Sequence, residues 1–143
     1  VILNPAPAHP LSPSLLQHLY IITPNETEAE MISGIKITNR ETAEKAAKVI
    51  TEMGVQNVII TLGSRGALVY CRPEMEMIPA IRVNAVDTTA AGDVFNGALA
   101  LALSEGHSIT DAVRFACKAA AISVTRVGAQ SSAPYRNEIE IFG

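Results

Sequence analysis

Short apolar runs that alternate with helical patterns constrain the fold of this chain more than any other feature. The runs Val1–Asn4, Tyr20–Thr23 and Asn57–Leu62 read as buried strands, and a proline or a glycine directly follows each of them. The segments between these runs carry apolar residues at helical spacing. This alternation predicts an α/β fold in which a parallel or mixed sheet has helices on its faces.

Capping patterns place several of the helices. Asn25 with Glu28 forms a capping-box pattern, and Gly34 ends the helix that follows. A second pattern of this kind runs from Thr38 to Glu41, and Gly54 ends that helix. Further helices are predicted from the leucines at 11, 15, 16 and 19, with Pro13 near the helix start, at Ala91–Ser104, and from Ser108 to about Thr125. Further strands are predicted at Ala67–Tyr70, Met75–Pro79 and Ile81–Val86. The tail after Gly128 is predicted to be a loop with a short turn near residues 135–141, and no internal domain boundary is predicted.

Composition excludes several classes of protein. With 143 residues, 48% hydrophobic and 17% charged, the chain can bury a core and is not typical of disorder. A net charge of −3 without a basic stripe argues against a nucleic-acid partner. The longest apolar run, Ala98–Leu103, is far shorter than the ~20 residues that span a bilayer, so we expect no membrane partner.

Cysteine usage and the start of the chain bear on its cellular setting. Cys71 and Cys117 are far apart in the sequence and form no CxxC motif, so we do not expect a zinc site. We expect a reducing, cytoplasmic location. No pattern of a signal peptide opens the chain. Because the sequence begins at Val1 inside a predicted strand, we expect a processed chain or a piece of a longer one.

The stretch from Val86 to Asp93 carries the most specific chemical signal. Small residues lead into a helix that is predicted to begin near Ala91, and the free N–H groups of such a helix start can bind an anion. Asp93, in the first turn, can take a proton from an attacking hydroxyl while these amides stabilise a transferring phosphoryl group. The alternative is that Asp93 only interacts favourably with the helix dipole.

Two further segments allow both a structural and a functional interpretation. Asn25 and Glu28 form an ordinary capping box, or else Glu28 orients water around Mg²⁺ with Asn25 near phosphates. The segment Thr61–Gly66 lies at the end of a predicted strand, where α/β sheets bind ligands. It therefore flanks a nucleotide or forms a plain hairpin turn.

Signatures of other enzyme classes are missing from the sequence. It contains no GxxxxGK[ST], no GxGxxG after a strand and no GxSxG. His9, His18 and His107 are all distant from Asp93 in the sequence, so we expect them at the surface without a catalytic role. Cys117 falls within a predicted helix and is expected to belong to the core rather than to act as a nucleophile.

Five segments together resemble the ribokinase-like carbohydrate kinases. They are Asn4–Pro7, Ile22–Glu30, Ile60–Gly66, Asp87–Gly97 and Thr125–Gln130, in the order of the family. The run Asp87–Asp93 is the most specific, and Gly128–Gln130 favours the ribokinase branch over the nucleoside kinases. The resemblance covers the whole chain, residues 1–143, and implies the C-terminal portion of a three-layer α/β/α fold with a mostly parallel sheet flanked by helices.

The resemblance also implies an activity and residue roles. The activity is transfer of the γ-phosphoryl group of ATP to the 5-hydroxyl of D-ribose, with deoxyribose or a ketose such as fructose as alternative acceptors. Asp93 is then the base that contacts the sugar, and the backbone amides of Ala90, Ala91, Gly92 and Asp93 form the anion hole. The residues implied to bind the nucleotide are Asn25, Thr61, Gly63, Ser64, Arg65, Gly66, Gly92 and Cys117, the last replacing a family histidine or asparagine on the adenine side.

Two metal ions are implied in the same way. Glu28 resembles the family residue that serves Mg²⁺ through water. The implied ligands of a monovalent cation, usually K⁺, are Asp87, Thr89, Ser123, Arg126, Gly128 and Ser132, several of them through backbone carbonyls. Arg126 can offer only its carbonyl, because its side chain is cationic.

The resemblance covers only the C-terminal half of the family's chains. The other half carries most of the sugar site and the β-lid, through which family members commonly form homodimers. We therefore expect the chain alone to phosphorylate ribose poorly, because it cannot position the acceptor hydroxyl.

Two other classes stay open. One is a non-catalytic nucleotide-binding module that kept the fold, which the intact Asp93 and glycines disfavour. The other is a redox Rossmann domain, which predicts NAD binding but needs a glycine fingerprint that the chain lacks.

Overall fold

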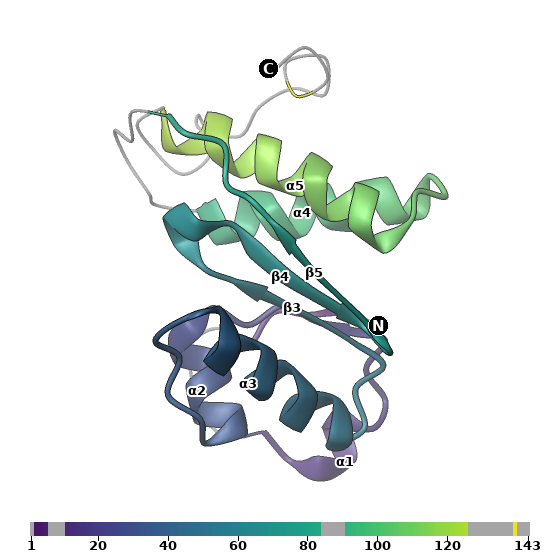
Figure 1. The fold of residues 1–143 in the computed structure, drawn as a ribbon. Helices are drawn as coiled ribbons and strands as arrows, with labels where there is room; N and C mark the ends of the chain where they lie inside the picture. Colours follow the sequence, from purple (N-terminus) through teal and green to yellow (C-terminus); the bar gives the residue numbers. More distant parts are fainter. Residues whose placement is uncertain (1, 6–10, 84–90, 126–138, 140–143) are drawn as a thin grey trace. The chain divides into compact units, whose positions relative to one another are not determined.

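The computed structural model describes residues 2–5, 11–83, 91–125 and 139 (Figure 1). The chain divides into two compact units, Val1–Ile78 and Pro79–Gly143. The sequence did not indicate this boundary, because no linker rich in glycine or serine separates the two units.

The first unit is built on a five-stranded sheet with the order β1-β2-β3-β4-β5. Its strands are β1 (Ile2–Leu3), β2 (Ile21–Ile22), β3 (Asn57–Thr61), β4 (Ala67–Cys71) and β5 (Glu74–Ile78). The β1–β2 and β2–β3 pairs are parallel, whereas β3–β4 and β4–β5 are antiparallel. The α/β class is confirmed, but the pairings are evenly mixed instead of mostly parallel, because short connections bring the chain straight back after β3 and β4.

Helices α1 (Pro13–Leu16), α2 (Glu26–Ser33) and α3 (Arg40–Glu52) cover one face of this sheet (Figure 1). Alternate residues of β3, Val58 and Ile60, belong to the same buried cluster as Ala46 and Ile50 of α3. Ile59, on the opposite face of β3, is also fully buried. The central strands are therefore buried on both faces, as is usual in α/β proteins.

One predicted helix length and one predicted cap differ from the structure. The leucine pattern with Pro13 near its start predicts a helix that extends to Leu19. Helix α1 does begin at Pro13, but it is a single turn, because the chain must return to the sheet at Ile21. The second capping box begins at Asn39 rather than at Thr38. The Asn39 Oδ1 accepts a hydrogen bond from the Thr42 backbone N–H at 2.9 Å, and asparagine is among the strongest N-cap residues.

The second unit contains a pair of helices, α4 (Ala91–Ser104) and α5 (Ile109–Val124), which pack along each other (Figure 1). Both agree with the predicted segments. The buried residues of α4 follow helical spacing, with Phe95, Ala98, Leu99 and Ala102 on one face. The Ser108 Oγ caps α5 by accepting a hydrogen bond from the Asp111 N–H at 3.2 Å.

Parts of two predicted segments fall outside the described residues. Residues 81–83 are irregular rather than the start of a strand, and the rest of the predicted strand Ile81–Val86 is not among the described residues. The predicted turn at residues 135–141 also lies outside the described residues, apart from Ile139. None of the helices among the described residues has both the length and the hydropathy of a membrane-spanning segment.

Candidate functional site

The capping box at the start of α2 is present with good geometry. The Asn25 Oδ1 accepts a hydrogen bond from the Glu28 N–H at 2.8 Å, and the Glu28 Oε1 accepts one from the Asn25 N–H at 3.0 Å. Glu28 is 4% exposed, whereas Asn25 is exposed to solvent. The structural interpretation of this pair is thus confirmed, and its role toward Mg²⁺ stays a prediction.

The end of β3 lies beside this helix start. The Thr61 N–H donates to the Pro24 carbonyl at 2.9 Å, and Asn25 and Thr61 form an isolated parallel bridge. Because β2 and β3 are parallel, their carboxyl ends share one edge of the sheet, which is where α/β sheets bind ligands. The structure therefore brings together two of the sequence-predicted segments, Asn25–Glu28 and Thr61–Gly66.

The loop that follows β3 is a tight turn, as predicted. Residues Gly63–Arg65 form one 3-10 turn, and the Leu62 N–H donates to the Gly66 carbonyl at 2.8 Å. Gly63 and Gly66 have φ angles of 58° and 99°, which side chains disfavour. Gly63, Ser64 and Arg65 are exposed, so the loop is accessible to a ligand.

An ion pair that sequence reasoning missed links this loop to α2. The Arg65 Nη2 lies 2.7 Å from the Glu26 Oε2. The only signal in the sequence is that the two residues have opposite charge and belong to motifs that were both expected near a nucleotide.

The first turn of α4 contains Ala91, Gly92 and Asp93, and the helix begins at Ala91 as predicted. Gly92 and Asp93 are exposed, and a Cβ at Gly92 would have no other atom within 4 Å. The Asn96 Nδ2 donates to the Gly92 carbonyl at 2.9 Å. The exposed Gly92 and Asp93 are compatible with the predicted anion hole, which stays a prediction.

Helix α5 carries two more of the predicted site residues, Cys117 and Ser123. Burial raises the pKa of the Cys117 thiol from 9.0 to about 11. The thiolate is therefore scarce near neutral pH. Cys117 is half-buried rather than fully in the core as predicted. Ser123 is fully buried.

The other predicted site residues lie outside the described part of the chain. They are Asp87, Thr89, Ala90, Arg126, Gly128 and Ser132. Of the three histidines, His18 and His107 are exposed, and His9 is not among the described residues.

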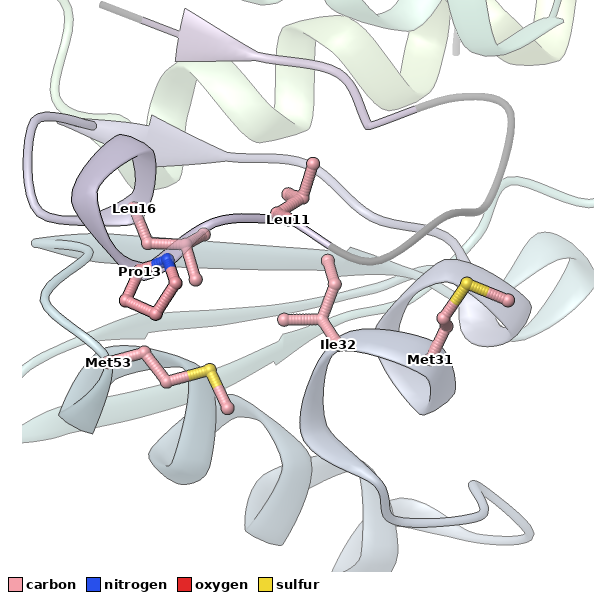
Figure 2. Close-up of a pocket in the computed structure, with 6 residues that line it drawn as sticks. All are labelled: Leu11, Pro13, Leu16, Met31, Ile32 and Met53. Carbon is pink, nitrogen blue, oxygen red and sulfur yellow. The ribbon is translucent and has the colours of Figure 1, made fainter.

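A groove on the first unit offers a different chemistry from the edge of the sheet. Figure 2 shows its lining residues, which are all apolar: Leu11, Pro13, Leu16, Met31, Ile32 and Met53. The side chains of these lining residues offer no hydrogen-bond donor to a phosphate group. The sheet edge near Asn25 and the start of α4 are therefore the candidate sites for charged ligands.

Comparison with known proteins shows the family. A family model described as pfkB family carbohydrate kinase matches residues 1–136. The chain belongs to the pfkB family of carbohydrate kinases. A ribokinase of Haemophilus influenzae is 51% identical over 138 residues, which are 96% of this chain and 45% of that protein. A deoxyribokinase of Salmonella typhi is 40% identical over 135 residues, which are 94% of this chain and 44% of that protein.

Solved structures confirm the ribokinase-like fold. A ribokinase of Thermotoga maritima has a TM-score of 0.92 and 51% identity, covering 99% of this chain and 48% of that one. An Arabidopsis thaliana ribokinase complexed with ribose and ATP has a TM-score of 0.93 and 34% identity, covering 98% of this chain and 46% of that one. The chain thus spans about half the length of the relatives that it matches.

Proposed function

We propose that this chain is the nucleotide-binding and catalytic half of an ATP-dependent sugar kinase whose acceptor is D-ribose. One observation carries this proposal. Asp93 is exposed in the first turn of α4, and 96% of the chain aligns with a ribokinase at 51% identity. Deoxyribose is the main alternative acceptor, because a deoxyribokinase is also among the relatives. A ketose is the third candidate acceptor.

In the proposed mechanism Asp93 accepts the proton of the sugar 5-hydroxyl. The freed oxygen attacks the γ-phosphorus, the bond from this phosphorus to the β,γ-bridging oxygen breaks, and ADP leaves. The backbone amides of residues 90–93 stabilise the negative charge on the transferring group. The support for this role is that N–H groups in the first turn of a helix have no partner within the helix.

The proposed nucleotide site follows the edge of the sheet in the first unit. Asn25, Thr61 and the Gly63–Gly66 loop are its main residues, and they are supported by their common position at the carboxyl ends of β2 and β3. Cys117 is proposed to contact the adenine. A half-buried, uncharged thiol suits an apolar contact with a base.

Mg²⁺ and K⁺ are part of the proposal. Among the described residues no group of three or more His, Cys, Asp or Glu side chains could hold a metal. Mg²⁺ keeps several waters and is bound by few protein groups together with substrate phosphates. Glu28 is proposed to serve the ion through water, and the ion would neutralise phosphate charge.

The proposed K⁺ ligands are oxygen atoms, which suit a hard cation. They include Ser123, which the structure places in the last turn of α5, together with residues outside the described part. We also propose a cytoplasmic location. A full-length protein with the family's lid is proposed to form a homodimer through that lid.

Replacing Asp93 by asparagine tests the base role in the protein that carries this chain. We expect turnover with ATP and ribose to fall by about 10²- to 10⁴-fold, the usual contribution of general-base catalysis, with nucleotide binding by calorimetry unchanged. Asp111→Asn is the matched control, because Asp111 is also an exposed aspartate in the first turn of a helix. Unchanged turnover in Asp93→Asn would remove Asp93 from the mechanism.

Comparing acceptors tests the substrate. The kcat/KM of the wild-type protein is measured for ribose, deoxyribose and fructose, and ribose is expected to be highest. A higher value for deoxyribose or fructose would replace ribose as the substrate. Nucleotide binding without phosphorylation of any sugar would instead support a non-catalytic module.

A further inference from the structure

We infer that Arg65 is a positioning residue, whose ion pair with Glu26 holds the Gly63–Gly66 loop against the first turn of α2 and thereby increases the affinity for ATP. The inference rests on the proposed function, since it assumes that ATP binds at this edge of the sheet. It assigns to Arg65 an indirect role in place of direct contact with the nucleotide.

The geometry of the pair is that of a charge-assisted hydrogen bond. The Arg65 Nη2 and the Glu26 Oε2 are 2.7 Å apart, although the residues are 39 positions apart in the sequence. Their side chains are 46% and 36% exposed. Such a partly exposed pair adds little to global stability, but it can fix the relative position of the two segments that it joins.

Arg65 adds a side-chain link between the loop and another element. Gly63 and Gly66 flank it with positive φ angles, and a Cβ at Gly63 would meet no other atom within 4 Å. The backbone hydrogen bonds from Leu62 to Gly66 and from Gly66 to Gly63 stay inside the turn. The side chain of Arg65 extends from the turn to a different element, α2.

Charge also favours the indirect role. Glu26 follows Asn25, which the proposed function places near phosphates, and an unpaired carboxylate there would repel them. The Arg65 guanidinium compensates this charge. A phosphate that bound Arg65 directly would have to compete with Glu26 for the same guanidinium.

A double-mutant cycle tests the inference. Arg65→Ala, Glu26→Gln and the double variant are compared by the KM for MgATP and by ADP calorimetry. Each single variant is expected to raise the KM for MgATP about two- to five-fold, the factor that corresponds to the energy of an exposed ion pair. The double variant should be no worse than the poorer single variant, and kcat and the KM for ribose should be unchanged.

A second ion pair provides the matched control. Arg40 and Glu44 form an exposed pair at 3.1 Å on α3, and Arg40→Ala should leave the KM for MgATP unchanged. The effects of Arg65→Ala and Glu26→Gln should shrink in 1 M salt, because salt screens exposed charges.

Two results would overturn the positioning role. One is that Arg65→Ala raises the KM for MgATP while Glu26→Gln lowers it or leaves it unchanged, which indicates direct contact with phosphate. The other is that both variants behave as the wild type. If the wild-type protein phosphorylates no sugar, the proposed kinase function fails, and ADP calorimetry on the same variants still decides the role of Arg65.

Discussion

Glu28 has one established role and one proposed role, and a conservative substitution separates them. Its carboxylate accepts the Asn25 N–H at 3.0 Å, so removing the side chain disturbs the helix start whatever else it does. Glu28→Gln keeps the cap, because glutamine also serves at this position of a capping box, but removes the charge. We expect unchanged thermal stability and a several-fold rise in the Mg²⁺ concentration that gives half-maximal turnover. Glu28→Ala should in addition lose about 1 kcal/mol of stability.

Glu30→Gln is the control for this measurement. Glu30 lies on the same helix, and its Oε1 accepts the Ile37 N–H at 2.9 Å, so the same chemical change again leaves an acceptor in place. The Mg²⁺ concentration that gives half-maximal turnover should be the same in Glu30→Gln as in the wild type. If Glu28→Gln also has the wild-type dependence, Glu28 is only a cap and its magnesium role is wrong.

At the scale of elements, Gly54 determines how the connection from α3 to β3 passes the end of α1. Its φ is 115°, and a Cβ there would lie 2.9 Å from the Gln17 Cα and 2.8 Å from the Gln17 Cγ. Gly54→Ala therefore combines backbone strain with a clash against backbone. We expect it to reduce the free energy of unfolding by about 1–3 kcal/mol in urea denaturation.

Gly97→Ala is the opposite case and serves as the control. Gly97 lies inside α4, and a Cβ there would have no other atom within 4 Å. Alanine has the higher helix propensity, so the protein should become about 0.5–1 kcal/mol more stable. Equal stability of Gly54→Ala and the wild type would contradict the close approach of Gln17.

The sequence predicted the elements and contacts that depend on local patterns. The bounds of α4 follow from its apolar spacing and the later Gly106, and the cap of α2 needs only Asn25 and Glu28. The length of α1 is limited because the chain must return to the sheet. The Arg65–Glu26 pair forms because the order of the strands brings the end of β3 beside the start of α2. Those two depend on residues far away along the chain, so no local pattern could reveal them.

At the scale of the whole molecule, the proposed functional residues belong to both compact units. Asn25, Glu28 and the Gly63–Gly66 loop lie in Val1–Ile78, whereas Asp93, Cys117 and Ser123 lie in Pro79–Gly143. Phosphoryl transfer needs the nucleotide, the base and the acceptor hydroxyl in one geometry. The proposed chemistry also needs the sugar site that the resemblance assigns to the other half of the relatives.

This dependence predicts that nucleotide binding and catalysis separate when the 143-residue chain is produced alone. We expect a chain that is folded by circular dichroism to bind ADP in calorimetry with Mg²⁺ and K⁺, but to show almost no ATP-dependent phosphorylation of ribose. The reason is that correct orientation of the acceptor accounts for about 7–11 kcal/mol of a barrier.

The control is a full-length relative, such as the ribokinase of Haemophilus influenzae, assayed under the same conditions. Full turnover by the 143-residue chain would refute the need for another half, because every residue for positioning the sugar would then lie within these units. A folded chain that fails to bind ADP would contradict the proposed half-site. The nucleotide would then require residues from the other half, or the assignment of the Gly63–Gly66 loop and Cys117 to the nucleotide would be wrong.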